Sequence, residues 1–290
     1  MTKRVTKYCF SGHESFPCKT MWLKKGYDFV RAGRDFNSPD AVVDLGVGKN
    51  MVASIRYWLK SFGLYDGSTT TPLANYLFDD QQGKDIYLED IASLQLLHFT
   101  LVHRGEATLY PMLFCGLQRE RSSFDREQAL SYVALRMAED GKQRLFNANT
   151  VKKDIAVLLQ NYSLPRKPLS NEDFSSLMID LDLIRQSSED KDYYFNHGGK
   201  RQVVPEVFLY ALLTIQEECG DRSLPFETVQ DNIGLVFCMN EMGTVNMLRA
   251  LSEAYPAVLS YSDVAGIRQI QFTSDADRMN ILDDYYDTHD

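Results

Sequence analysis

The chain has 290 residues, of which 44% are hydrophobic, and its formal net charge is −9. A chain of this length and hydrophobic content buries one large core or two to three smaller ones, which excludes a disordered protein. It shows no signal segment, no apolar run long enough to span a membrane and only five scattered cysteines, so we expect a cytoplasmic protein with free thiols and no membrane partner.

The charge is distributed unevenly along the chain. Residues 1–65 contain eleven basic and five acidic side chains, whereas residues 66–290 contain 20 basic and 35 acidic ones. Phosphate contacts need Lys and Arg, so the net charge of the whole chain argues against DNA binding, but the basic N-terminal part favours it. The acidic remainder is consistent with protein contacts, or with a solvated surface that needs no partner.

The segment FSGHESF concentrates glycine, histidine, acid and serine. Cys9, His13 and Cys18 are irregularly spaced and have no fourth ligand nearby, so we predict no metal site. His13 and Glu14 are adjacent and would point to opposite faces of an extended segment, which disfavours an acid–base pair. His13 and Ser15 are instead candidates for hydrogen bonds, either to the protein's own backbone, which we favour, or to a DNA phosphate.

A first helix is predicted from about Thr20 to Ala32. Its apolar residues recur at helical spacing, and its polar side carries Lys24 and Lys25. We expect this helix to be the first of a three-helix unit.

Residues 38–65 predict the other two helices of that unit, joined by a tight turn. Ser38 is a good N-cap, and Gly46 would end the first helix of the pair. From about Lys49 the apolar residues recur at helical spacing, and Gly63 follows where a C-terminal glycine belongs. The pattern is that of a helix-turn-helix motif, in which an aliphatic residue, a glycine and a further aliphatic residue pack two steeply crossing helices together; here these are Val42, Gly46 and Val52.

The second helix of this motif would present a polar face near its N-terminus. Asn can read adenine in the DNA major groove, and Lys or Arg can read guanine or hold phosphate. We therefore predict DNA contacts at Lys49, Asn50, Ser54, Arg56, Tyr57 and Lys60, supported by Lys24 and Lys25. Helical hairpins with a glycine turn also occur in proteins that never touch DNA, so a purely structural role is the alternative.

Known enzyme motifs are missing. LGVGKN resembles a phosphate-binding loop, but that motif needs a glycine in place of Val43, Ser or Thr in place of Asn50, and a strand before the turn. The chain has no G-x-S-x-G elbow, no H-E-x-x-H and no paired C-x-x-C. We therefore predict a protein that is not an enzyme and has no cofactor.

The remaining segments predict further helices with small hairpins. An apolar helix is expected from about Glu89 to His103, and a turn-rich run at 66–71 with another turn at 82–83 would supply the bends of a wing hairpin. Two alternating runs around Asp263 to Gly266 predict a C-terminal hairpin. The fold class is thus mainly α with small antiparallel β-hairpins, in tandem helix-turn-helix or winged-helix-like units. We predict three domains: residues 1–118 (basic, helix-turn-helix), 119–220 (central, winged-helix-like) and 221–290 (helix plus hairpin).

Four separated blocks of the chain resemble one prokaryotic family. They are FSGHESF with WLKKGYDFV, DAVVDLGVGKNMVASIRYWLKSFGL, DIYLEDIASLQLLHFTL and YSDVAGIRQIQF. The family is uncharacterised, is classed as a domain of unknown function and is often encoded beside genes resembling phosphoadenosine-phosphosulfate reductase, in DNA phosphorothioation and anti-phage islands. The resemblance implies a role in DNA modification or defence and supplies no activity.

The sequence therefore predicts a DNA-binding, non-catalytic recognition or adaptor subunit of a DNA sulfur-modification or anti-phage system, with DNA and a protein of that system as partners. One alternative is a protein-interaction scaffold for a partner enzyme. The other is a transcriptional regulator of its own operon, which would normally need a symmetric dimer and a palindromic site.

Overall fold

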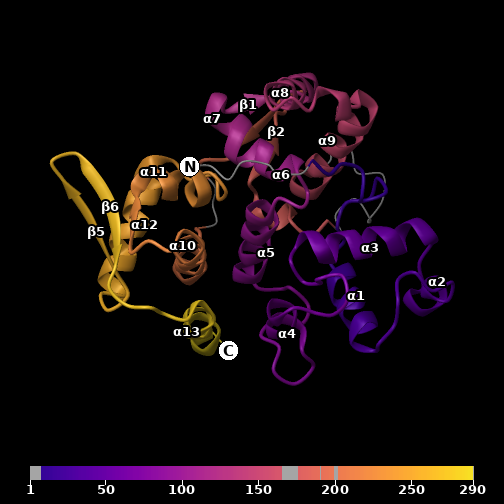
Figure 1. The fold of residues 1–290 in the computed structure, drawn as a ribbon, viewed down its shortest axis with the longest axis horizontal. Helices are drawn as coiled ribbons and strands as arrows, with labels where there is room; N and C mark the ends of the chain where they lie inside the picture. Colours follow the sequence, from indigo (N-terminus) through magenta and orange to yellow (C-terminus); the bar gives the residue numbers. More distant parts are fainter. Residues whose placement is uncertain (1–7, 165–175, 190, 199–201, 290) are drawn as a thin grey trace. The chain divides into compact units, whose positions relative to one another are not determined.

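The computed structural model describes residues 8–164, 176–189, 191–198 and 202–289 (Figure 1). This described part is mainly helical and contains two antiparallel sheets of three strands each, which confirms the predicted fold class at that level. The chain divides into two compact units, an N-terminal unit within Val5–Asn196 and a C-terminal unit within His197–Asp290. No helix in the described part is long and apolar enough to cross a membrane.

Three helices at the start of the N-terminal unit form the predicted three-helix group. They are α1 (Trp22–Arg31), α2 (Ala41–Leu45) and α3 (Lys49–Ser61). Each of them packs against the other two, and Figure 1 shows α1 and α3 side by side. Gly46 and Gly63 adopt left-handed φ angles of 60° and 69° at the ends of α2 and α3, as the sequence predicts. Val42, however, is 37% exposed, so α2 packs through Ala41 and Leu45 alone.

Gly26 allows α1 to approach α3 closely. A Cβ atom added there would lie 2.5 Å from Leu59 Cδ1 and 2.8 Å from Ile55 Cγ2. We expect Gly26→Ala to destabilise the N-terminal unit by about 1–3 kcal/mol, because both buried side chains would have to move. Both tryptophans of the chain lie in this unit, so urea unfolding followed by tryptophan fluorescence measures the effect.

Gly48→Ala is the matched control for that substitution. An added Cβ at Gly48 would meet nothing within 4 Å, so we expect a loss below about 1 kcal/mol. Equal unfolding free energies for the two variants would contradict the close packing of α1 on α3.

The segment after α3 differs from the prediction of a wing hairpin. Asp66 Oδ1 accepts hydrogen bonds from the backbone N–H groups of Ser68 and Thr69, which makes a turn, and an isolated bridge joins Tyr65 to Thr70. The chain then forms a further helix, α4 (Pro72–Phe78), in place of a strand. Its start is fixed by Thr71, whose side chain caps the helix, and by proline at the first position.

The next helix, α5 (Ile91–Arg104), is long, apolar and largely buried, and its bounds are close to the predicted ones. His98 on this helix is fully buried, and its Nδ1 lies 2.7 Å from the hydroxyl of Tyr162. It is therefore a core histidine with a polar partner. A continuous helical stretch follows, with a π-helical turn in its middle: α6 (Leu109–Pro111), η1 (Met112–Leu117) and α7 (Gln118–Glu120).

The rest of the N-terminal unit combines a helix pair with a small sheet. In chain order the elements are β1 (Ser123–Phe124), α8 (Arg126–Glu139), η2 (Gln143–Leu145), α9 (Ala148–Tyr162), η4 (Ile179–Leu181), β2 (Ile184–Gln186) and β3 (Tyr193–Phe195). The strand order is β1-β3-β2, and all pairs are antiparallel. The run LSNEDFSSLMIDLDLIRQ at 169–186 predicts a short helix that passes into a loop, and its first part, 169–175, lies outside the described residues.

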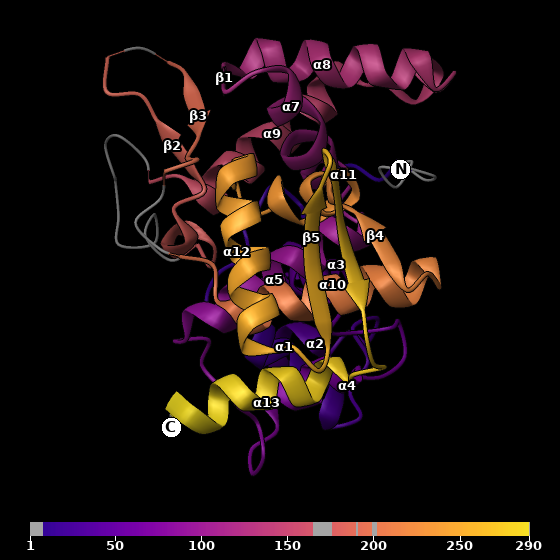
Figure 2. The same cartoon turned by 90° about the vertical axis from the view of Figure 1, so that its left-hand side faces the viewer.

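The C-terminal unit repeats this order of elements. It contains α10 (Pro205–Cys219), β4 (Ser223–Pro225), α11 (Phe226–Val229), η5 (Gln230–Gly234), α12 (Glu241–Ala254), β5 (Leu259–Val264), β6 (Ile267–Phe272) and α13 (Arg278–His289). Its strand order, β4-β6-β5, matches that of the first sheet. Figure 2 shows α12 beside the hairpin, which turns at Ala265 and Gly266 as predicted.

One segment, α10, lies in a different unit from the one predicted. The sequence-based division ends the central domain at residue 220, whereas α10 packs with α12 and α13 in the C-terminal unit. The physical reason is that α10 packs against α13, α12 and η5, and β4, separated from it by three residues, pairs with β6 of the same unit.

The five cysteines are free, as predicted, but they differ in exposure. Burial raises the pKa of the Cys18 thiol well above its ordinary value, which keeps it protonated and unreactive. We expect Ellman's reagent at pH 8 to modify Cys219 first, and Cys18, Cys115 and Cys238 only after unfolding, as followed by absorbance. Cys219→Ser should remove the fast phase; a fast phase that persists in this variant would contradict the burial pattern.

Candidate nucleic-acid interface

The outer face of α3 carries the exposed part of the predicted DNA-contact set. Lys49, Asn50 and Ala53 are exposed on its first turns, and Lys60 is exposed near its end, 3.8 Å from Glu106. Ion pairs this long and this exposed contribute little, so Lys60 can exchange its partner for a phosphate. Three polar or basic side chains thus lie on one exposed helix without a strong internal partner.

The first turn of α3 adds a positive electrostatic potential that favours an anion. Gly48 is the N-cap residue, no side chain caps the helix, and no acidic residue lies in its first turn. The free backbone N–H groups and the positive end of the helix dipole therefore favour an anion at this end. Lys49 stands at the same place, which makes this end of α3 suited to a phosphate group.

Arg56 is half-buried and makes a hydrogen bond within the three-helix group. Its guanidinium donates a hydrogen bond to Asn37 Oδ1 at 2.9 Å, which holds the loop before α2. A phosphate contact by Arg56 would have to compete with this bond.

Two other residues of α3 that the sequence predicts to contact DNA are covered, one fully and one in part. Ser54 is fully buried, so it is a packing residue. Tyr57 lies against Gly12, where an added Cβ would be 2.4 Å from the ring, and burial raises the pKa of its hydroxyl. Tyr57 is half-buried and packs against the preceding segment.

The two lysines of α1 also differ from the prediction. Lys24 is 8% exposed, and its ammonium group lies 2.5 Å from Asp28 and 2.7 Å from Asp80. Its charge is compensated within the protein, and a phosphate contact by Lys24 would have to compete with both carboxylates. Lys25 is exposed, but it donates a hydrogen bond to the carbonyl of Leu45 at the end of α2.

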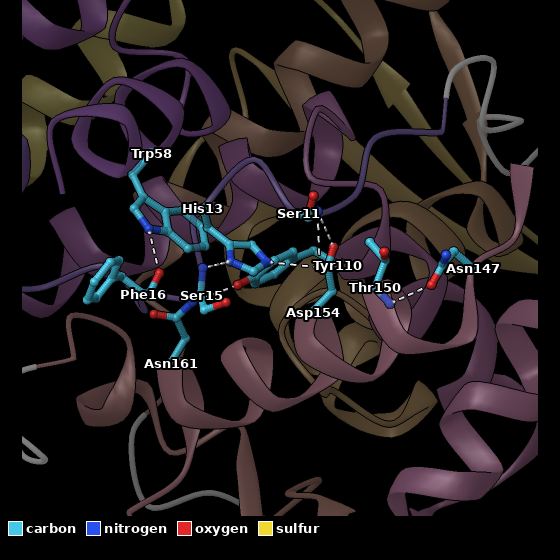
Figure 3. Close-up of polar contacts among 10 residues, drawn as sticks. All are labelled: Ser11, His13, Ser15, Phe16, Trp58, Tyr110, Asn147, Thr150, Asp154 and Asn161. Atoms are coloured by element: carbon cyan, nitrogen blue, oxygen red, sulfur yellow. Dashed lines mark hydrogen bonds and ion pairs between the residues drawn. The ribbon is translucent and has the colours of Figure 1, made fainter. Parts of the chain in front are cut away.

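A buried His–Asp pair fixes the segment before α1 (Figure 3). His13 Nε2 lies 3.1 Å from Asp154 Oδ1, and both side chains are at least 94% buried. His13 Nδ1 accepts a hydrogen bond from the backbone N–H of Ser15. Both carboxylate oxygens of Asp154 accept from the backbone N–H of Ser11, at 3.0 and 2.9 Å. The favoured structural role of His13 matches this geometry, whereas Ser15 is exposed.

The same segment connects α3 with α9. Trp58 on α3 donates from its indole nitrogen to the carbonyl of Phe16, and Asn161 on α9 accepts from the backbone N–H of Cys18 at 2.9 Å. The loop that precedes Phe16 is strained, since the non-glycine residues Ser11, Glu14 and Ser15 have φ angles of 62°, 49° and 65°. The surrounding hydrogen bonds hold this conformation.

Sequence reasoning missed Asp154 as the partner of His13, because the two lie far apart in the chain. A signal was present: Asp154 interrupts the apolar stripe of α9 between Val151 and Ile155, and a carboxylate on a buried helix face needs a partner. The described residues contain no group of three or more His, Cys, Asp or Glu side chains that could hold a metal ion.

Most of the chain matches a known protein family. Residues 10–286 match the model of a family described as "Protein of unknown function (DUF4007)". No curated protein matches the chain. An SspB crystal structure is similar, with 25% sequence identity and a TM-score of 0.82 over 97% of this chain and 88% of that chain. A magnesium ion-bound SspB crystal structure is similar as well, with 24% identity and a TM-score of 0.81 over the same shares.

Proposed function

This chain belongs to the DUF4007 family, and on that premise we propose that it is a DNA-binding, non-catalytic recognition or adaptor subunit of a DNA sulfur-modification or anti-phage system. The observation that carries the proposal is the outer face of α3. It combines exposed Lys49, Asn50 and Lys60 with an uncapped helix N-terminus. Such a face is suited to phosphate contacts and to reading base edges.

The tandem winged-helix organisation is part of this proposal. A helix, a short strand, two helices and a two-stranded hairpin follow one another from α6 to β3 and again from α10 to β6. In both sheets the first strand pairs with the last. This is the element order of a helix-turn-helix unit with a wing, and it supports the tandem units predicted from the sequence.

The setting of the function comes from the family resemblance. The resemblance implies a family that is often encoded in DNA phosphorothioation and anti-phage islands, so the proposed partners are DNA and a protein of such a system in the cytoplasm. The C-terminal unit suits the protein contact, because residues 197–290 contain 15 acidic and six basic side chains and repel phosphate.

A protein-interaction scaffold is the second candidate, and one observation favours it. Val42 and Val43 on α2 are 37% and 80% exposed, beside the polar face of α3. Exposed apolar side chains at this position would fit a protein surface.

Duplex binding over a salt series separates these functions. Fluorescence anisotropy with random-sequence, operon-promoter and phosphorothioated duplexes should show binding that weakens steeply with salt. Preference for the promoter duplex would indicate the regulator. Absence of binding at low salt would refute DNA binding and leave the scaffold.

The non-catalytic part of the proposal needs its own test. Supercoiled plasmid incubated with the protein and magnesium should stay supercoiled on an agarose gel, and magnesium is included because one similar structure is magnesium ion-bound. Nicked or linear product would contradict a non-catalytic role.

A further inference from the structure

A second exposed basic surface lies on α8 and α9, outside the residues that the sequence predicts to contact DNA. Lys142 and Arg144 are exposed in the turn between the two helices, and Asn149 and Lys153 are exposed on the first turns of α9. Leu145, between them, is 62% exposed. We call these five residues the α9 surface.

The acidic side chains around the α9 surface already have partners. Glu139 pairs with Arg136, and Glu127 pairs with Lys152 at 2.9 Å. Asp154 faces inward to His13. These acids therefore do little to neutralise the α9 surface.

Asp140, at the end of α8, accepts a hydrogen bond from the hydroxyl of Tyr8 at 2.7 Å. This neutral donor holds the carboxylate in place without cancelling its charge. Lys142, Arg144 and Lys153, in contrast, form no ion pair with any residue that the structure describes. Basic side chains without internal partners, gathered on one surface, attract an external polyanion.

The topology gives this surface an orientation suited to duplex DNA. α8 and α9 are the helix pair that precedes the β2–β3 hairpin, so α9 stands where a helix-turn-helix unit places its groove-reading helix. Asn149 can pair with an adenine edge, Arg144 and Lys153 can hold phosphates on either side, and Leu145 can contact a thymine methyl group.

We propose that the α9 surface is a second duplex-DNA contact, which acts together with the outer face of α3. The inference rests on the proposed function and deepens it. The two contacts belong to the same compact unit, and the segment 8–18 is bonded to both helices. One duplex held at two places dissociates more slowly and depends more steeply on salt than one held at a single place.

The test is the salt dependence of duplex binding by the full chain with Arg144→Ala and Lys153→Ala. Two lost phosphate contacts should lower the slope of log affinity against log salt by about 1.8, at about 0.9 per charge. The matched control is Arg222→Ala with Arg249→Ala, which removes two exposed charges of the C-terminal unit and should leave the slope unchanged.

The outcomes distinguish this inference from the proposed function. Wild-type binding with a reduced slope in the Arg144, Lys153 variant alone supports the α9 surface. Wild-type binding with an unchanged slope in that variant overturns the inference and leaves the proposed function standing. No binding by the wild type overturns both. Circular dichroism melting of each variant verifies folding, which we expect to be unchanged because all four side chains are exposed.

Discussion

A variant with Lys49→Ala and Lys60→Ala should bind duplex DNA on the order of 50-fold more weakly than the wild type at 0.1 M salt, with a salt slope lower by about 1.8. Both side chains are exposed on α3, and only Lys60 has an ion pair, at 3.8 Å. Their removal therefore takes away charge without disturbing packing. Arg56 is left intact because it holds Asn37.

The control for this variant is again Arg222→Ala with Arg249→Ala, which removes the same charge from the C-terminal unit. Fluorescence anisotropy on one duplex over a salt series measures all three proteins. Equal losses in the test and control variants would mean that net charge alone governs binding, and no loss in the test variant would show that α3 does not contact DNA.

Asp154→Ala should destabilise the N-terminal unit by about 1–3 kcal/mol. The substitution removes the carboxylate that accepts hydrogen bonds from the Ser11 N–H group, and a donor left unpaired costs about 1–3 kcal/mol; His13 Nε2, 3.1 Å from the same carboxylate, makes no hydrogen bond to it. Tryptophan fluorescence reports on this unit alone, because Trp22 and Trp58 both lie in it. Urea unfolding followed by this signal gives the free energy.

Lys153→Ala is the neighbouring control on α9. Lys153 is exposed, so its loss should change the free energy of unfolding by less than about 0.5 kcal/mol. Asp154→Asn keeps one acceptor oxygen and should give an intermediate value. If Asp154→Ala unfolds at the same urea concentration as Lys153→Ala, the His13–Asp154 pair does not hold the segment.

Local signals in the sequence were enough to predict α1, α3 and α5. The bounds of α3 follow from the glycines at 46 and 63 and the apolar spacing between them, and the β5–β6 hairpin follows from its Ala-Gly turn. The start of α4 also had a local signal, the capping Thr71 followed by Pro72. It was not predicted because a wing hairpin was expected at this place.

Contacts between distant parts of the chain could not be predicted in this way. Lys24 appeared to be a surface cation because its partner Asp80 lies 56 residues further on. Ser54 is a polar residue and was therefore assigned to the exposed face of the helix, but tertiary packing buries it. Asp154 and His13 meet across 141 residues, and no spacing rule links them.

Photocrosslinking from the outer face of α3 tests the central claim most directly. Asn50, replaced by p-benzoylphenylalanine, should give a covalent adduct with labelled duplex DNA that disappears at high salt, whereas the same group in place of the exposed Tyr87 should give none. An Asn50 adduct that exceeds the Tyr87 background confirms that α3 faces DNA. Binding of the duplex without an adduct at Asn50, or equal adducts at both positions, would contradict it.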